Sequence, residues 1–251
     1  MVPAVLLRTA VCVTGRFPAL AGVDLAVAQG EVVVLEGPNG AGKTSVLRVC
    51  AGLLPLTGGE GTVLGCDLRR DVAALRGRVG MLGHAAALYD DLTVVENVRF
   101  AVRAAGADVA RIDAALDRLE LGGRVRRTPV GRLSAGQRRR VALALLVTRR
   151  PELWLLDEPH AGLDASARET LNQLVAEAAD AGVTVVIASH EADFVESLAT
   201  RAVVVVGGRV TAERSIGGTG AGAPPAAPVP GPDVVRPGSG QPPEGRVAHV
   251  A

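Results

Sequence analysis

One segment constrains the fold of this chain more than any other: Gly37-Pro38-Asn39-Gly40-Ala41-Gly42-Lys43-Thr44, which fits the pattern G-x-x-x-x-G-K-[ST] of a phosphate-binding loop. Apolar residues 32–35 before it predict a buried strand, and residues 45–50 after it predict the start of a helix. Between a strand and a helix, backbone N–H groups converge on phosphate oxygens and the helix N-terminus adds partial positive charge. The alternative is a glycine-rich turn that ends in Lys-Thr.

The last two residues of the motif, Lys43 and Thr44, have side chains that can bind a nucleotide and its metal ion. The Lys43 ammonium can reach the β- and γ-phosphates of a nucleotide, and the Thr44 hydroxyl can ligate Mg²⁺. Lys43 is the only lysine among 27 basic residues, and arginine fits poorly into a narrow phosphate cradle. The residues predicted to bind the nucleotide here are Gly37, Pro38, Asn39, Gly40, Ala41, Gly42, Lys43, Thr44 and Ser45.

Composition excludes several function classes. The net charge of +1 provides no strong basic field, so we expect no nucleic-acid partner. The arginines at 138–140 are expected on a solvated helix face.

Cys12, Cys50 and Cys66 form no C-x-x-C pair and predict buried free thiols in a reducing cytosol. No apolar run approaches the ~18–20 residues of a membrane span, and we expect no signal peptide, so a membrane role requires a partner.

The chain alternates between strand-rich and helical segments. Residues 11–14, 23–28, 62–64 and 79–82 are expected to be strands, with a turn at 58–61. A helical insert is expected over about 84–148, with helices at 110–119 and 138–148. Thr93 and Glu96 predict a capping box. Strands at 153–158 and 183–188, helices at 166–179 and 194–198, and a hairpin over 202–210 follow.

This order predicts an α/β fold with an N-terminal antiparallel part, a helical subdomain and a mixed, largely parallel sheet that is covered on both faces. We expect one domain over residues 1–216. Residues 217–251 are rich in Gly, Pro and Ala, and they bury too little apolar surface to offset the entropy of ordering. We therefore expect a disordered tail.

Two carboxylates end the predicted strand at 153–158. Asp157 is placed to hold Mg²⁺, usually through water, and Glu158 is placed to orient or deprotonate an attacking water. The alternative is a pair of acids that simply end a strand.

The segment Leu133-Ser134-Ala135-Gly136-Gln137 resembles the Leu-Ser-Gly-Gly-Gln signature of the ATP-binding-cassette (ABC) ATPases. The motif order also matches this family: phosphate loop, signature, apolar strand with Asp-Glu, Ala161-Gly162-Leu163-Asp164, and His190 after a strand. The resemblance covers about residues 5–215 and implies the P-loop NTPase fold of the ABC type, with ATP and Mg²⁺ as cofactors.

The resemblance also implies partners and residue roles. Two such subunits, as a homodimer, would face head to tail, and Ser134, Gly136 and Gln137 would contact the nucleotide held by the other subunit. Asp164 would link the two sites, and His190 would bind the γ-phosphate; a strand-end histidine without that role is the alternative. An integral-membrane transporter subunit would hold the ATPase at the cytoplasmic face of the cell membrane.

Two positions depart from the family pattern. The aromatic residue that usually stacks on adenine is replaced by Thr14, which leaves Phe17 as a substitute or as a core residue. The usual glutamine that senses γ-phosphate is replaced by His84, a third candidate catalytic residue.

The pair Gly83-His84 and the Leu-Ser-Ala-Gly-Gln variant look like the ATP-binding subunit of the haem exporter of cytochrome c maturation. That family commonly continues Gly-His-Gln-Pro, whereas Ala85-Ala86 follow here, and the segment around His160 is closer to general drug, lipid or ABC-2-type exporters.

Two further interpretations belong to other classes. A soluble ABC ATPase acting on ribosomes, DNA or an iron–sulfur scaffold is disfavoured, because the chain has one cassette and no sustained heptads. A regulatory module without turnover is disfavoured by Glu158 and His190.

Overall fold

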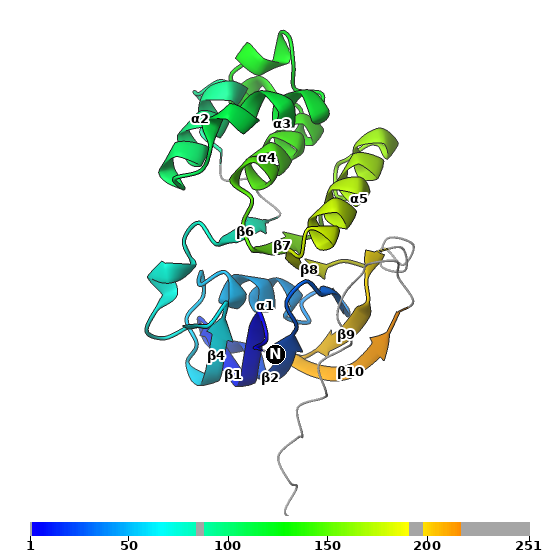
Figure 1. The fold of residues 1–251 in the computed structure, drawn as a ribbon. Helices are drawn as coiled ribbons and strands as arrows, with labels where there is room; N and C mark the ends of the chain where they lie inside the picture. Colours follow the sequence, from blue (N-terminus) through cyan, green and yellow to red (C-terminus); the bar gives the residue numbers. More distant parts are fainter. Residues whose placement is uncertain (1, 84–87, 191–197, 217–251) are drawn as a thin grey trace, which may run out of the picture.

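The structure is a computed structural model that describes residues 2–83, 88–190 and 198–216. Figure 1 shows a strand-rich part below and a helical subdomain above, connected through the β6–β7 region. The strands are β1 (Val5–Thr14), β2 (Phe17–Val27), β3 (Val32–Glu36), β4 (Gly58–Val63), β5 (Cys66–Asp67), β6 (Val79–Leu82), β7 (Leu153–Asp157), β8 (Thr184–Ala188), β9 (Arg201–Val206) and β10 (Arg209–Ser215). The α-helices are α1 (Lys43–Cys50), α2 (Val94–Ala104), α3 (Ile112–Arg118), α4 (Ala135–Arg149) and α5 (Ala165–Asp180). Short 3₁₀ helices are η1 (Val72–Leu75), η2 (Val109–Arg111), η3 (Val125–Arg127) and η4 (Val130–Arg132).

A six-stranded sheet in the order β10-β9-β3-β8-β7-β6 forms the centre of the described chain. The five strands from β9 to β6 are parallel, and β10 joins β9 as an antiparallel hairpin. The mixed, largely parallel sheet predicted from the apolar strands is therefore confirmed. The carboxyl ends of β3 and β7 lie at the same edge, and the phosphate loop and Asp157 follow them there.

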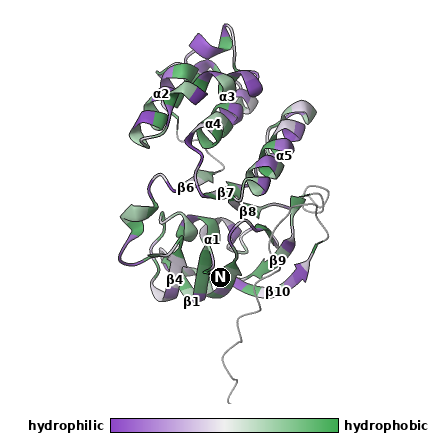
Figure 2. Cartoon of the chain, viewed as in Figure 1, coloured by the Kyte–Doolittle hydropathy of each residue, from purple (hydrophilic) through white to green (hydrophobic). Residues whose placement is uncertain are grey.

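Both faces of this sheet are buried, which explains why its strands are continuously apolar. In β3, Val32 and Val34 face a core shared with α2, α4 and α5, whereas Val33 and Leu35 face a second core around α1 and the small sheet. The same alternation holds in β7 and β8. Figure 2 shows the contrast between apolar β7 and the hydrophilic, exposed outer strand β10.

The second sheet is antiparallel, in the order β2-β1-β4-β5. The turn predicted at residues 58–61 is wrong, because these residues begin β4 and pair with β1. Gly59 has φ +73° opposite an irregularity in β1, and a Cβ there would lie 2.2 Å from the Thr9 carbonyl oxygen. A Cβ on Gly61 would lie 2.8 Å from Leu56. These glycines mark a bulge and a close approach, not a chain reversal. Strands β1 and β2 are also longer than predicted.

The helical subdomain contains α2, α3 and α4. The predicted capping box at α2 is confirmed: Thr93 Oγ1 accepts from the Glu96 N–H, and Glu96 Oε2 accepts from the Thr93 N–H. The predicted helix at 110–119 is present as η2 followed by α3, and the one at 138–148 is α4, which starts at Ala135.

The remaining predictions concern the cysteines, two segments near the C-terminus and membrane spans. Cys12, Cys50 and Cys66 are free, and Cys12 and Cys50 are buried, whereas Cys66 is only partly buried. The predicted helix at 194–198 lies almost wholly, and the tail at 217–251 entirely, outside the described residues, so both stay predictions. Among the described helices, none is long and apolar enough to cross a membrane.

Candidate functional site

The phosphate-loop segment connects the carboxyl end of β3 to the N-terminus of α1. Gly37 has φ +139° and Gly42 has φ +109°, a region that side chains rarely adopt. A Cβ on Gly37 would lie 2.0 Å from the Val205 carbonyl oxygen, and one on Gly42 would lie 2.9 Å from the Ala19 carbonyl oxygen. The loop therefore requires glycine at both positions to keep its curled backbone.

Lys43 and Thr44 are the first two residues of α1, and their side chains point in different directions. The Lys43 ammonium donates to the carbonyl oxygens of Gly37 at 2.6 Å and Pro38 at 3.1 Å, so the cation lies over the loop. The Thr44 hydroxyl donates to Asp157 Oδ1 at 3.0 Å. These residues are 113 positions apart in sequence, and the parallel pairing of the central strands brings them together.

A cavity of about 390 Å³ lies over this loop. Asn39 to Ser45 line one wall, Asp157 and Glu158 a second, and Pro18, Ala19, Gly207 and Gly208 the remainder. The cavity combines a lysine, backbone N–H groups, a helix N-terminus and two carboxylates. Such a surface suits a polyphosphate with a divalent cation.

Glu158 follows β7 with its backbone in the left-handed region, at φ +45°. That conformation is unfavourable for a residue with a side chain, and strained backbones of this kind cluster at functional sites. His190 Nδ1 lies 2.9 Å from Glu158 Oε2. The structure thus brings together two of the three residues predicted to be catalytic, whereas the third, His84, lies outside the described residues.

Arg139 is a site residue that the sequence analysis missed. The expectation of a solvated arginine face at 138–140 is wrong for this residue, which is 7% exposed. Its guanidinium donates to the carbonyl oxygens of Asp157 at 3.0 Å and Glu158 at 2.8 Å. It also donates to the carbonyl oxygens of Pro159 and Gly83. Burial lowers the pKa of Arg139, and the Asp157 and Glu158 carboxylates oppose that shift. Arg139 therefore fixes the backbone that carries Glu158.

The signature residues lie away from this cavity. Ser134 and Gln137 form a capping box at the start of α4, in which Ser134 Oγ accepts from the Gln137 N–H and Gln137 Oε1 accepts from the Ser134 N–H. A Cβ on Gly136 would lie 3.0 Å from the Gly162 carbonyl oxygen, so the Asp164 loop packs closely against the signature. Ser134 and Ala135 are exposed. The helix N-terminus therefore faces outward, available to another molecule.

Asp164 is held by α4 and α5 together. Its carboxylate caps α5 by accepting from the Ala167 N–H, and it accepts from Arg140 at 2.9 Å. The hydrogen bond from Ala167, and then the charge of Arg140, keep the pKa of Asp164 below its ordinary value. Arg140 also pairs with Glu120, so this arginine ties the Asp164 loop to the helical subdomain.

Phe17 lies on the surface beside the nucleotide cavity. It pairs with Thr14 across the end of the β1–β2 hairpin, and the next residue, Pro18, lines the cavity. Phe17 is 79% exposed, so the alternative of core packing is wrong. An exposed ring next to the cavity is placed to stack on a base.

A phosphate loop after a central parallel strand, with an acidic strand end beside its threonine, defines a nucleotide-binding P-loop protein. The sequence profile of the ABC transporter family matches residues 20–161. The chain belongs to this family, and it is an ATPase of the class that couples ATP hydrolysis to transmembrane transport.

Comparison with individual proteins agrees with this assignment. The chain is 44% identical over 170 residues to the cytochrome c biogenesis ATP-binding export protein CcmA of Mesorhizobium japonicum, which covers 67% of this chain and 83% of that protein. It is 40% identical over 203 residues to the daunorubicin resistance ATP-binding protein DrrA3 of Streptomyces coeruleorubidus, which covers 79% of this chain and 64% of that protein. A dimeric ATP-binding cassette solved in a post-hydrolysis state with ADP and Pi matches with a TM-score of 0.78 and 27% identity, over 84% of this chain and 98% of that one.

Proposed function

We propose that this chain is the ATP-hydrolysing subunit of a haem exporter that serves cytochrome c biogenesis. It would work as a head-to-tail dimer at the cytoplasmic face of the cell membrane, held there by an integral-membrane subunit. The observation that supports a head-to-tail dimer is the outward-facing N-terminus of α4, which lies apart from the chain's own nucleotide cavity. In a head-to-tail dimer, Ser134, Gly136 and Gln137 would contact the nucleotide on the other subunit.

The residues at the cavity fit MgATP. The Thr44 hydroxyl and the Asp157 carboxylate, 3.0 Å apart, are hard oxygen donors of the kind Mg²⁺ prefers. Among the described residues, no cluster of three His, Cys, Asp or Glu side chains forms a metal cage. This agrees with Mg²⁺, which usually takes one or two protein ligands and completes its shell with phosphates and water. The cation would neutralise charge on the phosphates.

Hydrolysis would depend on Glu158. Its carboxylate lines the cavity beside Asp157 and can accept a proton from a water held next to the terminal phosphate. His190, 2.9 Å from this carboxylate, would orient it and bind the γ-phosphate. His84 would occupy the γ-phosphate-sensing position, and Asp164 would link the two sites of the dimer. Phe17 would stack on the base.

Haem is the cargo that the sequence supports best. The chain is 44% identical to a cytochrome c biogenesis export protein, and its segments Gly83-His84 and Leu133-Ser134-Ala135-Gly136-Gln137 resemble the motifs of that family. The second candidate is export of another amphipathic compound, because a daunorubicin resistance protein is 40% identical over a longer segment.

The test is the ATPase activity of the complex. The full chain is purified with its integral-membrane subunit, reconstituted in lipid nanodiscs, and assayed with haem, with daunorubicin and with neither. Haem alone should raise turnover severalfold, and the Glu158→Gln complex should show no stimulation. Stimulation by daunorubicin and not by haem would favour the second candidate, and failure of any membrane protein to co-purify would contradict the transport role.

A further inference from the structure

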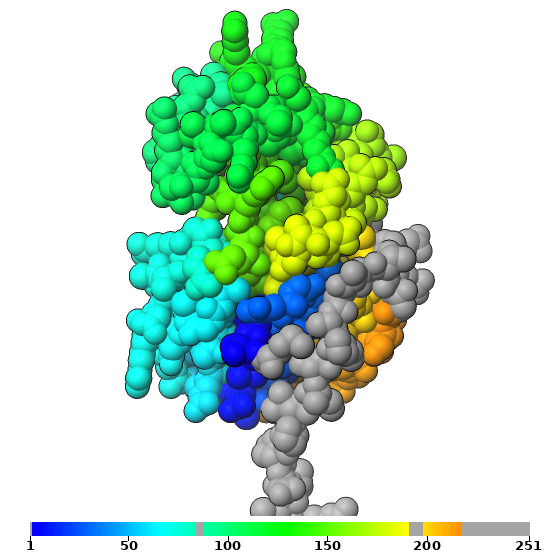
Figure 3. Space-filling view, viewed as in Figure 1, coloured from blue at the N-terminus to red at the C-terminus, as the bar shows by residue number. Residues whose placement is uncertain are grey.

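The β9–β10 hairpin ends in a turn that reaches the nucleotide cavity. Gly207 and Gly208, at φ +55° and +72°, form a two-residue turn between Val206 and Arg209, which pair with each other. Hairpin turns with two residues at positive φ favour glycine. In Figure 3 the orange segment that contains β10 lies away from the green helical subdomain, and no described residue of α2, α3 or α4 lines the nucleotide cavity. This wall of the cavity is therefore built by the strand-rich part alone.

Gly208 connects two parts of the site through its own backbone. Its N–H donates to the Ala41 carbonyl oxygen of the phosphate loop at 2.8 Å, and its carbonyl oxygen accepts from the Ala21 N–H of β2 at 2.8 Å. One residue thus joins the loop that would hold the phosphates to the strand that begins at Phe17. The contact of Ala41, Gly208 and Ala21 is referred to below as the Gly208 bridge.

The Gly208 bridge leaves no room for a side chain at position 208. A Cβ there would lie 3.0 Å from the Ala19 carbonyl oxygen, 3.0 Å from the Ala21 nitrogen and 3.1 Å from the Leu20 Cα. A Cβ on Gly42 would lie 2.9 Å from the same Ala19 oxygen and 3.3 Å from the Gly208 Cα. Loop, turn and strand therefore pack backbone against backbone. Because the three atoms nearest to a Cβ at position 208 all belong to β2, a side chain there pushes first on this strand.

Strand β2 carries the residue that is placed to contact the base. Phe17 is its first residue and is 79% exposed, and Pro18 and Ala19 line the cavity. Ala19, whose backbone meets Gly208, lies only two residues after Phe17. A shift of β2 at Ala19 therefore moves the Phe17 ring relative to the phosphate loop.

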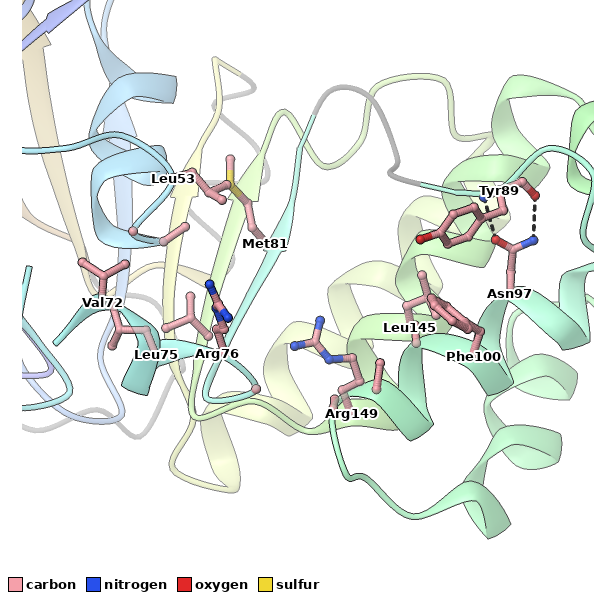
Figure 4. Close-up of a pocket in the computed structure, with 17 residues that line it drawn as sticks. Leu53, Val72, Leu75, Arg76, Met81, Tyr89, Asn97, Phe100, Leu145 and Arg149 are labelled. Atoms are coloured by element: carbon pink, nitrogen blue, oxygen red, sulfur yellow. Dashed lines mark hydrogen bonds between the residues drawn. The ribbon is translucent and has the colours of Figure 1, made fainter.

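A larger hollow in the described chain is separate from this arrangement. It has a volume of about 660 Å³ and lies between the segment from α1 to β6 and helices α2 and α4, and Figure 4 shows the side chains that line it. It shares no lining residue with the nucleotide cavity. A change at position 208 that alters nucleotide binding therefore does not act through this hollow.

We propose that Gly208 is a positioning residue for the nucleotide, whose backbone sets the distance between the phosphate loop and the stacking face of Phe17. This inference rests on the stacking role proposed for Phe17 and adds the residue that fixes where the ring lies. The base and the phosphates belong to one ligand, so stacking contributes fully to affinity only when the ring and the loop are held at the matching distance before the ligand binds.

The first test separates affinity from turnover. Full-length chain is purified as wild type, Gly208→Ala and the matched control Gly65→Ala. Gly65 lies in the β4–β5 turn with φ +78°, and a Cβ there would meet no atom within 4 Å, so this control carries similar backbone strain without the close contact. We expect Gly208→Ala to raise the KM for MgATP at least about fivefold and to keep kcat within about twofold, because stacking contributes equally to the ground state and the transition state. Gly65→Ala should keep wild-type values.

Two outcomes of this test contradict the inference. The first is the same KM in Gly208→Ala and Gly65→Ala. The second is a fall in kcat without a rise in KM, which would show that the change disturbs the reacting groups and not the binding of the base.

The second test measures the coupling between Gly208 and Phe17. Calorimetric titration with MgADP is carried out for wild type, Phe17→Ala, Gly208→Ala and the double variant. If Gly208 acts through the ring, the double variant should bind within about twofold as tightly as Phe17→Ala alone, whereas independent effects would multiply and overturn the inference. Weaker binding by Phe17→Ala with wild-type binding by Gly208→Ala would overturn this inference alone. Wild-type binding by Phe17→Ala would remove the proposed stacking role and the inference with it.

Ala21→Pro tests the bridge from its other side and leaves the turn itself unchanged. Proline has no N–H, so this change removes the hydrogen bond to the Gly208 carbonyl oxygen. It should also raise the KM for MgATP several-fold with kcat retained. A KM within about twofold of the wild-type value would show that the bridge does not position the ring.

Discussion

Arg139 offers the sharpest test of how the catalytic backbone is held. Its guanidinium donates to four carbonyl oxygens, those of Gly83, Asp157, Glu158 and Pro159, and the side chain is almost fully buried. Arg139→Met keeps much of the side-chain volume and removes every donor. Arg138→Met is the matched control, because Arg138 lies on the same helix but pairs with Asp90 on a more exposed surface.

The size of the effect follows from these bonds. A hydrogen bond to a charged group contributes about 1.5–3 kcal/mol, but four bonds from one group are not additive, and we take about 3 kcal/mol for the set. If the transition state loses this ~3 kcal/mol because Glu158 is no longer held in place, turnover falls about 100-fold, since each 1.36 kcal/mol is about tenfold in rate. The same loss lowers Tm by about 6–12 °C for a chain of this size.

The assay is steady-state ATP hydrolysis together with thermal unfolding of each variant. We expect Arg139→Met to lower kcat about 100-fold with less than about a threefold change in KM, because the phosphate loop is untouched. Arg139→Lys should recover little, because one ammonium cannot span four carbonyls. A folded Arg139→Met protein with kcat within about threefold of Arg138→Met would refute the positioning role.

Two further predictions concern the loop and the sheet. Gly37→Ala should lower MgATP affinity at least about tenfold in calorimetric titration, whereas Gly40→Ala should have a smaller effect. The reason is that a Cβ at position 37 would meet the Val205 carbonyl, whereas a Cβ at position 40 would meet no other atom within 4 Å. Equal losses of affinity in the two variants would contradict this. Arg78 lowers the pKa of Glu152, so this pair contributes stability above the unfolded pKa of about 4.3 and loses it as pH falls through the lowered folded value. Glu152→Gln should therefore lower Tm by about 1–3 °C at pH 7, and this difference should shrink as pH falls below about 4. A pH-independent difference would exclude the ion pair as the cause.

Local signals in the sequence predicted much of this fold. The Thr93–Glu96 box is specified within four residues and lies where expected. The apolar segments that became β3, β7 and β8 are buried on both faces, so their composition alone indicated central strands. The phosphate loop was recognisable because its residues are contiguous.

The errors concern features that depend on distant residues. Gly59 and Gly61 lie in a segment that the sequence predicts as a turn. Glycine is needed at these positions because Thr9 and Leu56, from neighbouring segments, leave no room for a side chain. Arg139 could not be separated from Arg138 and Arg140 by composition, because only packing of α4 against the end of β7 buries it.

The measurement that tests the central claim most directly is the assembly state of Glu158→Gln with MgATP, by size-exclusion chromatography with light scattering. This change keeps the shape of the side chain and removes the proton acceptor. We predict a stable ATP-dependent dimer that hydrolyses ATP at least about 100-fold more slowly than wild type. Adding Ser134→Arg, which places a bulky side chain at the exposed N-terminus of α4, should return it to a monomer. Near-normal hydrolysis by Glu158→Gln, or a dimer that persists with Ser134→Arg, would contradict the account.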